Sequence, residues 1–443
     1  MLLAFYSLAL LLVLIVGAPY WLLRMATTGK YREGFLERLG VVPRCLRQAV
    51  AGRRVVWVHA VSVGEALAAS RLIAELGERS GCLVVVSTTT ATGQRLARER
   101  FGADRVFYFP LDFAFAVRAW LRVLRPEMLV LLETELWPRL LTECRRREIP
   151  VCVVNARISD RSWPRYRRLR RLWRPLLAPL TAVLAQTELD AQRLHALGAT
   201  RAQAVGNLKY DIRIAATMPI VDAVREHRAE HAPVLVCGST CGVGAENEEQ
   251  LLLPALPVDA ITILAPRHPE RFALVADLLE ERRKQTGLPW HRRSTWGLEP
   301  LPLVAGSVLL LDSIGELASL YQLATVAFVG GSLVAAGGHN PLEPAQFGVP
   351  VVMGPYYQNF RGIVDALSQQ QALRLCAVDA LGATLREIID SPAEAEKMGE
   401  RGRVVCQREA GTTERVALKL LALLASASPA PVSRASASSE AAR

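Results

Sequence analysis

The sequence has no closely spaced cysteine pair of the kind that binds zinc or forms a redox motif. Its eight cysteines are scattered along 443 residues, none occurs as C-x-x-C, and the closest two are Cys237 and Cys241. This pattern favours a reducing compartment and argues against a zinc site or a disulfide framework. We therefore expect the cysteines to behave as small hydrophobic residues.

Several common catalytic motifs are also missing. The sequence contains no G-x-S-x-G, H-E-x-x-H or Walker A pattern, and no complete G-x-G-x-x-G follows the first apolar run. The last absence counts against a dinucleotide site. The glycine-rich stretch GSTCGVGAENEE lacks the lysine of a P-loop. We expect neither a metal nor a cofactor.

The N-terminus has no charge between residues 2 and 23, where LLAFYSLALLLVLIVGAPYWLL is long enough to cross a bilayer as a helix. No basic residue precedes this run and no small-residue cleavage site follows it, so we interpret residues 1–24 as an uncleaved anchor. Arg24, Lys30 and Arg32 come directly after it. The positive-inside rule then predicts a single-pass protein with its body in the cytoplasm.

The rest of the chain has the length and pattern of two α/β domains. Short, nearly continuous apolar runs alternate with helical patterns, which is typical of parallel sheets covered on both faces. We predict strands at 55–60, 83–88, 128–133, 151–156 and 181–186, and at 234–239, 261–266, 308–313, 326–331 and 349–354. The fold class is therefore α/β, with two doubly wound, Rossmann-like domains.

The predicted domain limits follow from this pattern. We place the first domain at 30–215, a polar hinge at 216–232 and the second domain at 233–425, with the last helices able to cross back onto the first. Residues 426–443 are low in complexity and are expected to form a disordered tail.

Candidate site residues lie where the predicted strands end, because ligands of open α/β sheets bind beyond the carboxyl ends of the strands. In the first domain Glu65 opens a helix after Ser62, as either a helix-dipole carboxylate or a general base. Glu133 and Glu135 follow another strand without a nearby third metal ligand, which favours hydrogen bonding or substrate positioning. Arg157 comes at the end of another predicted strand, and Lys209 follows a Gly-Asn turn near the hinge, either to neutralise a phosphate or as a solvated side chain.

The second domain offers a cationic strand end and a glycine loop. Arg267 and His268 follow a buried strand and suit an anion, the alternative being a salt bridge to a neighbouring helix. In GGSLVAAGGHNPLEP, Gly330 and Gly331 precede Asn340, a predicted N-cap, and Glu343, a predicted capping-box carboxylate. A loop and helix N-terminus of this kind present N–H groups to an anion. A self-capped helix without a ligand is the alternative.

The stretch RISDRSWPRYRRLRRLWRPL is unusually basic and aromatic. Nucleic-acid binding and a solvated helix face are the alternatives to a membrane interface. Because an apolar anchor is predicted in the same chain, we favour the interface, with arginines on anionic headgroups and tryptophans in the boundary. The residues assigned to this role are Arg167, Arg168, Arg170, Arg171, Trp163 and Trp173.

These motifs together resemble the 3-deoxy-D-manno-octulosonic acid (Kdo) transferases of lipopolysaccharide assembly. The resemblance runs from the anchor to about residue 405 and includes KYREGFLERLG, WVHAVSVGE, TTTATGQ, PLDF, ETELWP, NARISDRS, GNLKYD, APRHPERF, VGGSLVAAGGHNPLEP and GVPVVMGPY, in that order. It implies a GT-B arrangement, two Rossmann-like domains facing a cleft. It also implies an inverting transfer of Kdo from CMP-Kdo to a lipid A precursor, lipid IVA, at the inner membrane.

The resemblance also assigns roles to residues. Glu65 would be the catalytic base. From their positions along the chain, we assign the positioning of the acceptor to Ser62, Glu133, Glu135, Arg157 and Lys209. The donor would contact Arg267, His268, the Gly330–Gly331 loop and Asn340, with Glu343 on the ribose and Ser239 and Thr240 near the phosphate. Cys241 stands where the family usually has histidine, which puts a role for that side chain in doubt.

The net charge of +11 agrees with an anionic donor and a phosphorylated acceptor, since a positive cleft concentrates both. The alternatives are a GT-B glycosyltransferase with a UDP-sugar donor and a non-catalytic membrane scaffold of the same fold. No nucleic-acid partner is expected.

Overall fold

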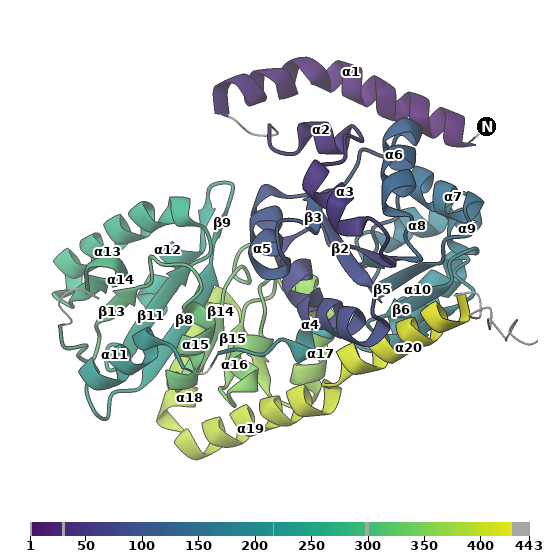
Figure 1. The fold of residues 1–443 in the computed structure, drawn as a ribbon. Helices are drawn as coiled ribbons and strands as arrows, with labels where there is room; N and C mark the ends of the chain where they lie inside the picture. The colour runs from purple at the N-terminus through teal and green to yellow at the C-terminus, as the bar shows by residue number, and fades with distance from the viewer. Residues whose placement is uncertain (1, 29–31, 216, 297–300, 428–443) are drawn as a thin grey trace, which may run out of the picture. The chain divides into compact units, whose positions relative to one another are not determined.

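The computed structural model describes residues 2–28, 32–215, 217–296 and 301–427. The chain divides into two compact units (Figure 1). Unit 1 comprises residues up to Asp211 together with those from Gly411 onward, and unit 2 comprises Ile212–Ala410.

Unit 1 is built on a parallel sheet that has seven strands within the described residues, in the order β3-β2-β1-β4-β5-β6-β7. The strands are β1 (Val55–His59), β2 (Leu83–Thr88), β3 (Val106–Tyr108), β4 (Met128–Leu132), β5 (Val151–Ala156), β6 (Ala182–Ala185) and β7 (Ala202–Ala204). The helices are α1 (Leu2–Thr28), α2 (Phe35–Arg38), α3 (Arg44–Val50), α4 (Val63–Ser80), α5 (Ala91–Phe101), α6 (Ala114–Leu124), α7 (Pro138–Arg146), α8 (Trp163–Arg168), α9 (Arg170–Leu177), α10 (Glu188–Leu197), the 3-10 turn η1 (Leu208–Asp211) and α20 (Thr412–Ala427).

Unit 2 repeats the plan with a parallel sheet, also of seven strands in its described part, in the order β12-β13-β11-β8-β14-β15-β16. The strands are β8 (Val234–Thr240), β11 (Ile261–Pro266), β12 (Trp290–Arg292), β13 (Val308–Leu310), β14 (Val326–Val329), β15 (Val351–Met353) and β16 (Leu373–Leu375), with a small hairpin of β9 (Gly242–Val243) and β10 (Glu246–Asn247). The α-helices are α11 (Pro219–His227), α12 (Glu248–Leu252), α13 (Phe272–Thr286), α14 (Arg293–Trp296), α15 (Leu317–Leu320), α16 (Leu342–Gln346), α17 (Arg361–Gln369), α18 (Leu381–Asp390) and α19 (Pro392–Glu409).

The predicted fold class is confirmed, because each of the predicted apolar runs forms a buried parallel strand with helices between. Central strands such as β1 and β4 are buried along their whole length. Such strands need apolar side chains on both faces, which is why they are recognisable as continuous apolar runs.

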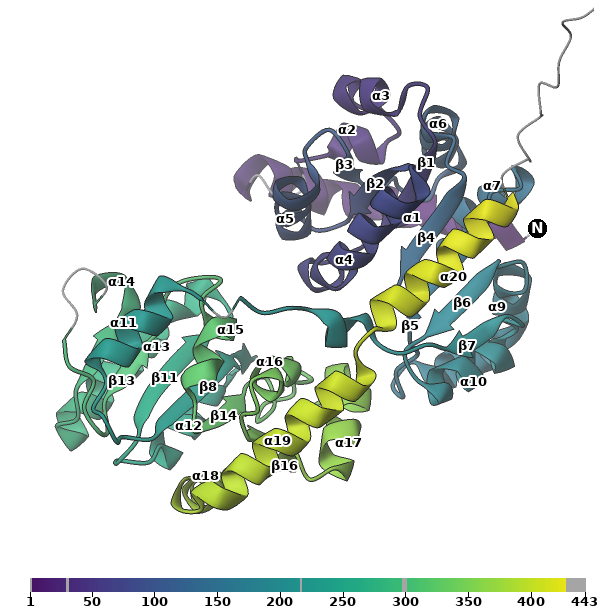
Figure 2. The same ribbon diagram turned by 60° about the horizontal axis from the view of Figure 1, so that its bottom comes forward.

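The expected hinge contains a helix of unit 2, and the last helix crosses back onto the first unit, which the sequence allowed for. Helix α11 lies inside the expected hinge, but Ile220, Val221 and Val224 are buried in the core of unit 2, so this segment belongs to that unit. Helix α20 returns to unit 1 and packs against α4 (Figure 2). It also extends to Ala427, past the expected start of the tail; residues 428–443 lie outside the described part.

Helix α1 is the candidate membrane segment. Within the described residues one stretch, Phe5–Thr27, is long and apolar enough to cross a bilayer, with a mean hydropathy of 2.0. The length and composition of this helix agree with the predicted anchor.

Candidate functional site

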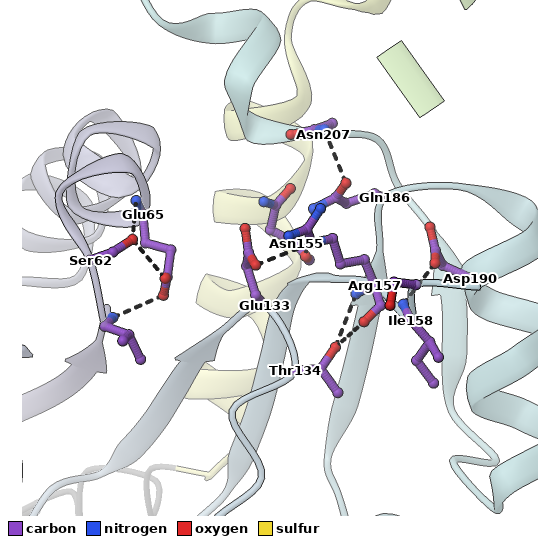
Figure 3. A network of polar contacts seen from close by, with 12 residues as sticks. Ser62, Glu65, Glu133, Thr134, Asn155, Arg157, Ile158, Gln186, Asp190 and Asn207 are labelled. Carbon is purple, nitrogen blue, oxygen red and sulfur yellow. Dashed lines mark hydrogen bonds and ion pairs between the residues drawn. The ribbon is translucent and has the colours of Figure 1, made fainter. Parts of the chain in front are cut away.

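Polar side chains of unit 1 gather where three neighbouring strands, β1, β4 and β5, end (Figure 3). Glu65 follows β1, Glu133 follows β4 and Arg157 follows β5. Lys209 lies on the turn η1. The structure therefore brings together residues that are up to 144 positions apart in the chain.

Glu65 forms a capping box at the start of α4. The Ser62 hydroxyl accepts a hydrogen bond from the Glu65 backbone N–H at 3.4 Å, and the Glu65 carboxylate accepts from the Val61 N–H and the Ser62 hydroxyl, both at 2.9 Å. These contacts hold the carboxylate in one orientation. The helix-dipole interpretation and the catalytic interpretation are thus compatible, because a carboxylate has further lone pairs.

The surroundings of Glu65 raise the pKa of its carboxyl group to near neutral pH. Burial, and then the negative charge of Glu133, raise its pKa to about 7, against the lowering effect of the Val61 and Ser62 hydrogen bonds. A carboxylate with this pKa is half ionised near neutral pH and can take up a proton there, which is the property of a general base.

Glu133 connects this carboxylate to the cationic side of the site. Its oxygens lie 3.2 Å from Nε of Arg157 and 3.9 Å from Nζ of Lys209. Burial lowers the pKa of Lys209, and the charge of Glu133 opposes that shift. Burial and then Glu133 raise the pKa of Glu135, so the three carboxylates lie within electrostatic reach of one another.

Neighbouring amides and hydroxyls hold these groups in place. Asn155 accepts from the Leu208 N–H at 3.1 Å and so connects the end of β5 to the turn that carries Lys209. Gln186 donates to the Asn155 carbonyl and accepts from Asn207, each at 3.0 Å. Gln186 and Asn207 were not among the predicted site residues. Their positions could have indicated a role, because both residues follow the ends of short strands.

In unit 2 the predicted donor residues meet at the carboxyl ends of β8, β11 and β14. Arg267 is exposed just after β11, and its N–H donates to the Thr240 carbonyl at 2.8 Å. Asn340 donates to Glu343 at 3.3 Å. Burial raises the pKa of Glu343, whereas the Asn340 hydrogen bond and the charge of Arg267 lower it.

His339 belongs to the same group, although the sequence analysis gave it no role. Burial, and then the positive charges of Arg267 and His268, lower its pKa to about 4. It is therefore neutral at physiological pH and does not repel the neighbouring cations. Its position in the motif GGHNPLEP, directly before Asn340, could have indicated that it belongs to the donor site.

The N–H groups of Gly330 and Gly331 are not free to bind an anion, contrary to the prediction. The Gly331 N–H donates to the buried carboxylate of Glu248 at 2.6 Å and the Gly330 N–H to the Gly238 carbonyl at 2.8 Å, so neither points to a ligand. A Cβ on Gly330 would lie 2.7 Å from the Ser239 carbonyl oxygen, and Gly331 has a φ of 67°. Glycine is required here by backbone packing and conformation.

The structure also differs from the predictions for the start of helix α16 and for the Thr240 hydroxyl. Helix α16 spans only Leu342–Gln346 with Pro341 at its N-cap position, although Asn340 still caps it by accepting from the Leu342 N–H at 3.2 Å. Thr240 is buried and donates to Glu249 at 2.8 Å, so its hydroxyl is engaged within the protein.

The basic stretch forms α8 and α9, and the structure separates its arginines from its tryptophans. Arg167, Arg168, Arg170 and Arg171 are exposed. Trp163 and Trp173 are half-buried and pack partly against the core of unit 1, and their entry into a membrane boundary stays a prediction. The exposed apolar side chains of this segment are Leu169 and Leu172.

Two parallel α/β units with their polar groups at the strand ends define a GT-B-type glycosyltransferase fold. A solved glycosyltransferase from Rickettsia africae matches 85% of this chain and 100% of its own with a TM-score of 0.56 at 10% identity. Anabaena Alr3699/HepE in complex with UDP and glucose matches 83% and 100% with a TM-score of 0.56 at 12% identity. At these identities the likeness concerns the fold alone.

Sequence relatives identify the family. The family model "3-Deoxy-D-manno-octulosonic-acid transferase (kdotransferase)" matches residues 33–212. The 3-deoxy-D-manno-octulosonic acid transferase of Haemophilus influenzae is 33% identical over 87% of this chain and 90% of its own length, and that of Bordetella pertussis is 35% identical over 81% and 85%. The chain belongs to the Kdo transferase family and is a glycosyltransferase.

Proposed function

We propose that the protein transfers Kdo from CMP-Kdo to a lipid A precursor, lipid IVA, with inversion at the anomeric carbon. The observation that carries this proposal is the Glu65 carboxylate, oriented by Val61 and Ser62 and given a pKa of about 7, in a chain of the Kdo transferase family. A non-catalytic scaffold would have no use for that arrangement.

In this mechanism Glu65 takes the proton of an acceptor hydroxyl while the hydroxyl oxygen attacks the anomeric carbon of Kdo. A carbon–oxygen bond to the acceptor forms, the bond from that carbon to the phosphate oxygen breaks, and CMP leaves with the electron pair. A single displacement inverts the centre and needs no covalent intermediate. Lys209 and Arg157 would meet the acceptor's phosphates, with Ser62, Glu133 and Glu135 positioning its hydroxyls.

The donor would bind unit 2. Arg267 supplies positive charge for its phosphate and carboxylate, His268, Ser239 and Asn340 supply polar contacts, and Glu343 accepts from the ribose hydroxyls. With the Arg267 guanidinium on the phosphate side, we propose a reaction that uses no metal and no cofactor.

The reaction would take place at the cytoplasmic face of the inner membrane. Helix α1 would attach the protein, and the exposed arginines of α8 and α9 would contact anionic headgroups, with Leu169 and Leu172 as the apolar contacts.

The test is to incubate the purified full-length protein with CMP-Kdo and a tetraacylated lipid A precursor, and to weigh the product by mass spectrometry. A mass increase of one or more Kdo units is expected, and its size counts the sugars added. A parallel incubation replaces the donor with UDP-sugars. Transfer from a UDP-sugar alone would overturn the donor assignment, and no transfer from any donor would favour a scaffold.

A further inference from the structure

Unit 2 contains a fully buried carboxylate that the proposed mechanism does not use. Glu248 is the first residue of α12 and is 0% exposed. One of its oxygens accepts from the N–H groups of Cys241, at 3.0 Å, and Gly331, at 2.6 Å. The other accepts from the N–H groups of Ser332, at 3.0 Å, and Leu333, at 2.9 Å. The anion that the glycine loop binds is therefore the carboxylate of Glu248, a side chain of the protein itself.

The neighbouring residue shows that this arrangement is specific to Glu248. Glu249 is equally buried, but it pairs with Arg271 and accepts from Thr240. Within the described residues, Glu248 accepts from backbone N–H groups, which compensate a buried negative charge only when several converge on it. Keeping a carboxylate here fixes the backbone that supplies those groups.

The backbone held in this way belongs to both sides of the candidate donor site. Cys241 directly follows Ser239 and Thr240 at the end of β8. On the other side, the Gly331 carbonyl accepts from the Gly338 N–H at 2.8 Å and the Gly330 carbonyl accepts from the His339 N–H at 3.1 Å. The segment that these bonds hold continues directly into Asn340 and Glu343.

We propose that Glu248 is a positioning residue of the donor site, which ties the end of β8 to the Gly330–Leu333 loop and so sets the distance between Ser239 and the His339–Glu343 segment. The inference rests on the proposed function, because it takes the ligand of this site to be the nucleotide of a CMP-sugar. Glu248 acts through the backbone and does not touch the donor.

The test replaces Glu248 by glutamine, which keeps the shape but turns an amide N–H₂ toward backbone donors. Titration calorimetry with CMP on the full-length protein should show a ten- to hundredfold weaker Kd, since displacements of about 1 Å at a site cost up to about 10²-fold. The KM for CMP-Kdo should rise, while the KM for the acceptor, which is assigned to unit 1, should not change. The matched control is Glu246→Gln, an exposed carboxylate of the same segment, for which no change is expected.

The outcomes separate this inference from the proposed function. If the wild type does not bind CMP, the donor assignment fails and the inference with it. If the wild type binds CMP and folded Glu248→Gln binds it equally well, a lower unfolding temperature alone would show a purely structural role and overturn the inference. If Glu248→Gln does not fold, Glu248→Asp retains the charge with a shorter reach, and wild-type CMP affinity in that variant would equally overturn it.

Discussion

At the residue scale, the candidate sites combine carboxylates with strained backbone. Glu133, Asn155 and Ser239 have φ angles of 53°, 57° and 58°, a region that residues other than glycine seldom adopt. All of them stand where a central strand ends, and Glu133 and Asn155 make contacts that organise the surroundings of Glu65. Backbone strain concentrated at such positions is typical of functional sites.

Glu65→Gln should abolish most of the transfer activity, because the amide cannot take up the acceptor's proton. A fall in kcat of about 10²- to 10⁴-fold is expected for the loss of a general base, with CMP affinity unchanged. Glu78→Gln, at an exposed position of the same helix, is the control and should leave kcat unaltered. Turnover near the wild-type level in Glu65→Gln would contradict the assignment.

The pH dependence should report the raised pKa of Glu65. The base must be deprotonated, so kcat/KM should rise with pH through about 7 and level off above it. Glu133→Gln removes a negative charge that raises this pKa, so the midpoint of the profile should move to lower pH. An unchanged midpoint, or a shift to higher pH, would argue that the profile belongs to another group.

At the scale of elements, side chains that cap the N-termini of α4 and α20 hold these two helices in place. Ser62 and Glu65 cap α4 in a way that also orients the candidate base. Helix α20 is capped from a distant part of the chain, because the Asp211 carboxylate accepts from the N–H groups of Gly411 and Thr413. These N–H groups have no partner within the helix, so a carboxylate there stabilises its first turn.

Asp211→Ala should lower the free energy of unfolding by about 1–2 kcal/mol, the usual cost of losing a helix cap. Chemical denaturation followed by tryptophan fluorescence would measure the change. Asp222→Ala is the control, because Asp222 is exposed and forms a surface ion pair with Arg225; a change below about 0.5 kcal/mol is expected. Equal stabilities for both variants would show that α20 does not depend on this cap.

Replacing Arg167, Arg168, Arg170 and Arg171 by serine should reduce the binding of a variant without residues 1–28 to anionic liposomes. Each arginine near an anionic surface contributes about 1 kcal/mol, so a loss of at least tenfold in affinity is expected in co-sedimentation. The same change at exposed arginines of unit 2 (Arg283, Arg386, Arg403 and Arg408) is the control. Equal losses in both variants would leave only a nonspecific charge effect.

At the scale of the whole molecule, the chain builds unit 1 from two separated segments. It leaves this unit at Asp211 and returns at Gly411, after all of unit 2 has been formed. Val416, Ala417, Leu420 and Leu424 of α20 are buried, and the helix packs against α4, which carries Glu65. The C-terminal helix therefore supports the element that presents the candidate base.

A chain that ends at Glu409 should be much less soluble and should unfold at a lower temperature than the wild type, because it exposes apolar surface of α4 and removes the partners of Asp211. A chain that ends at Ala427 is the control and should match the wild type. Soluble yield and thermal unfolding would measure both. A soluble, stable protein ending at Glu409 would show that α20 is dispensable for unit 1.

The sequence predicted the central strands better than the edges. The predicted runs became the inner strands of both sheets, since strands buried on both faces require continuous apolar residues. The edge strands β3, β7, β12 and β16 were not predicted. Each spans only three residues, and β7 and β12 are not buried, so the edge positions leave little apolar pattern to recognise.

Site residues were predictable where their role follows from their position at a strand end. They were not predictable where it follows from contacts with residues far away in the chain. Glu65, Glu133 and Arg157 follow from the rule that polar groups at strand ends share one edge of the sheet, whereas Lys209 was singled out by the Gly-Asn turn before it. The pairing of Glu248 with the glycine loop joins residues 83 to 85 positions apart, and no local pattern indicates it. The partial packing of Trp163 and Trp173 on the core was not predicted, because amphipathic spacing does not distinguish a membrane from the protein's own core.

By itself, the sequence determined the two parallel α/β units and the apolar first helix, since these follow from the periodicity of apolar residues. It also indicated the sugar-transferring family, through the ordered series of motifs that resemble that family's. Only the tertiary structure decided which carboxylate has a pKa near 7, which glycine-loop donors are already taken, and to which unit the last helix belongs. Those properties arise from burial and from charges that distant parts of the chain bring together, and they have no counterpart in the order of neighbouring residues.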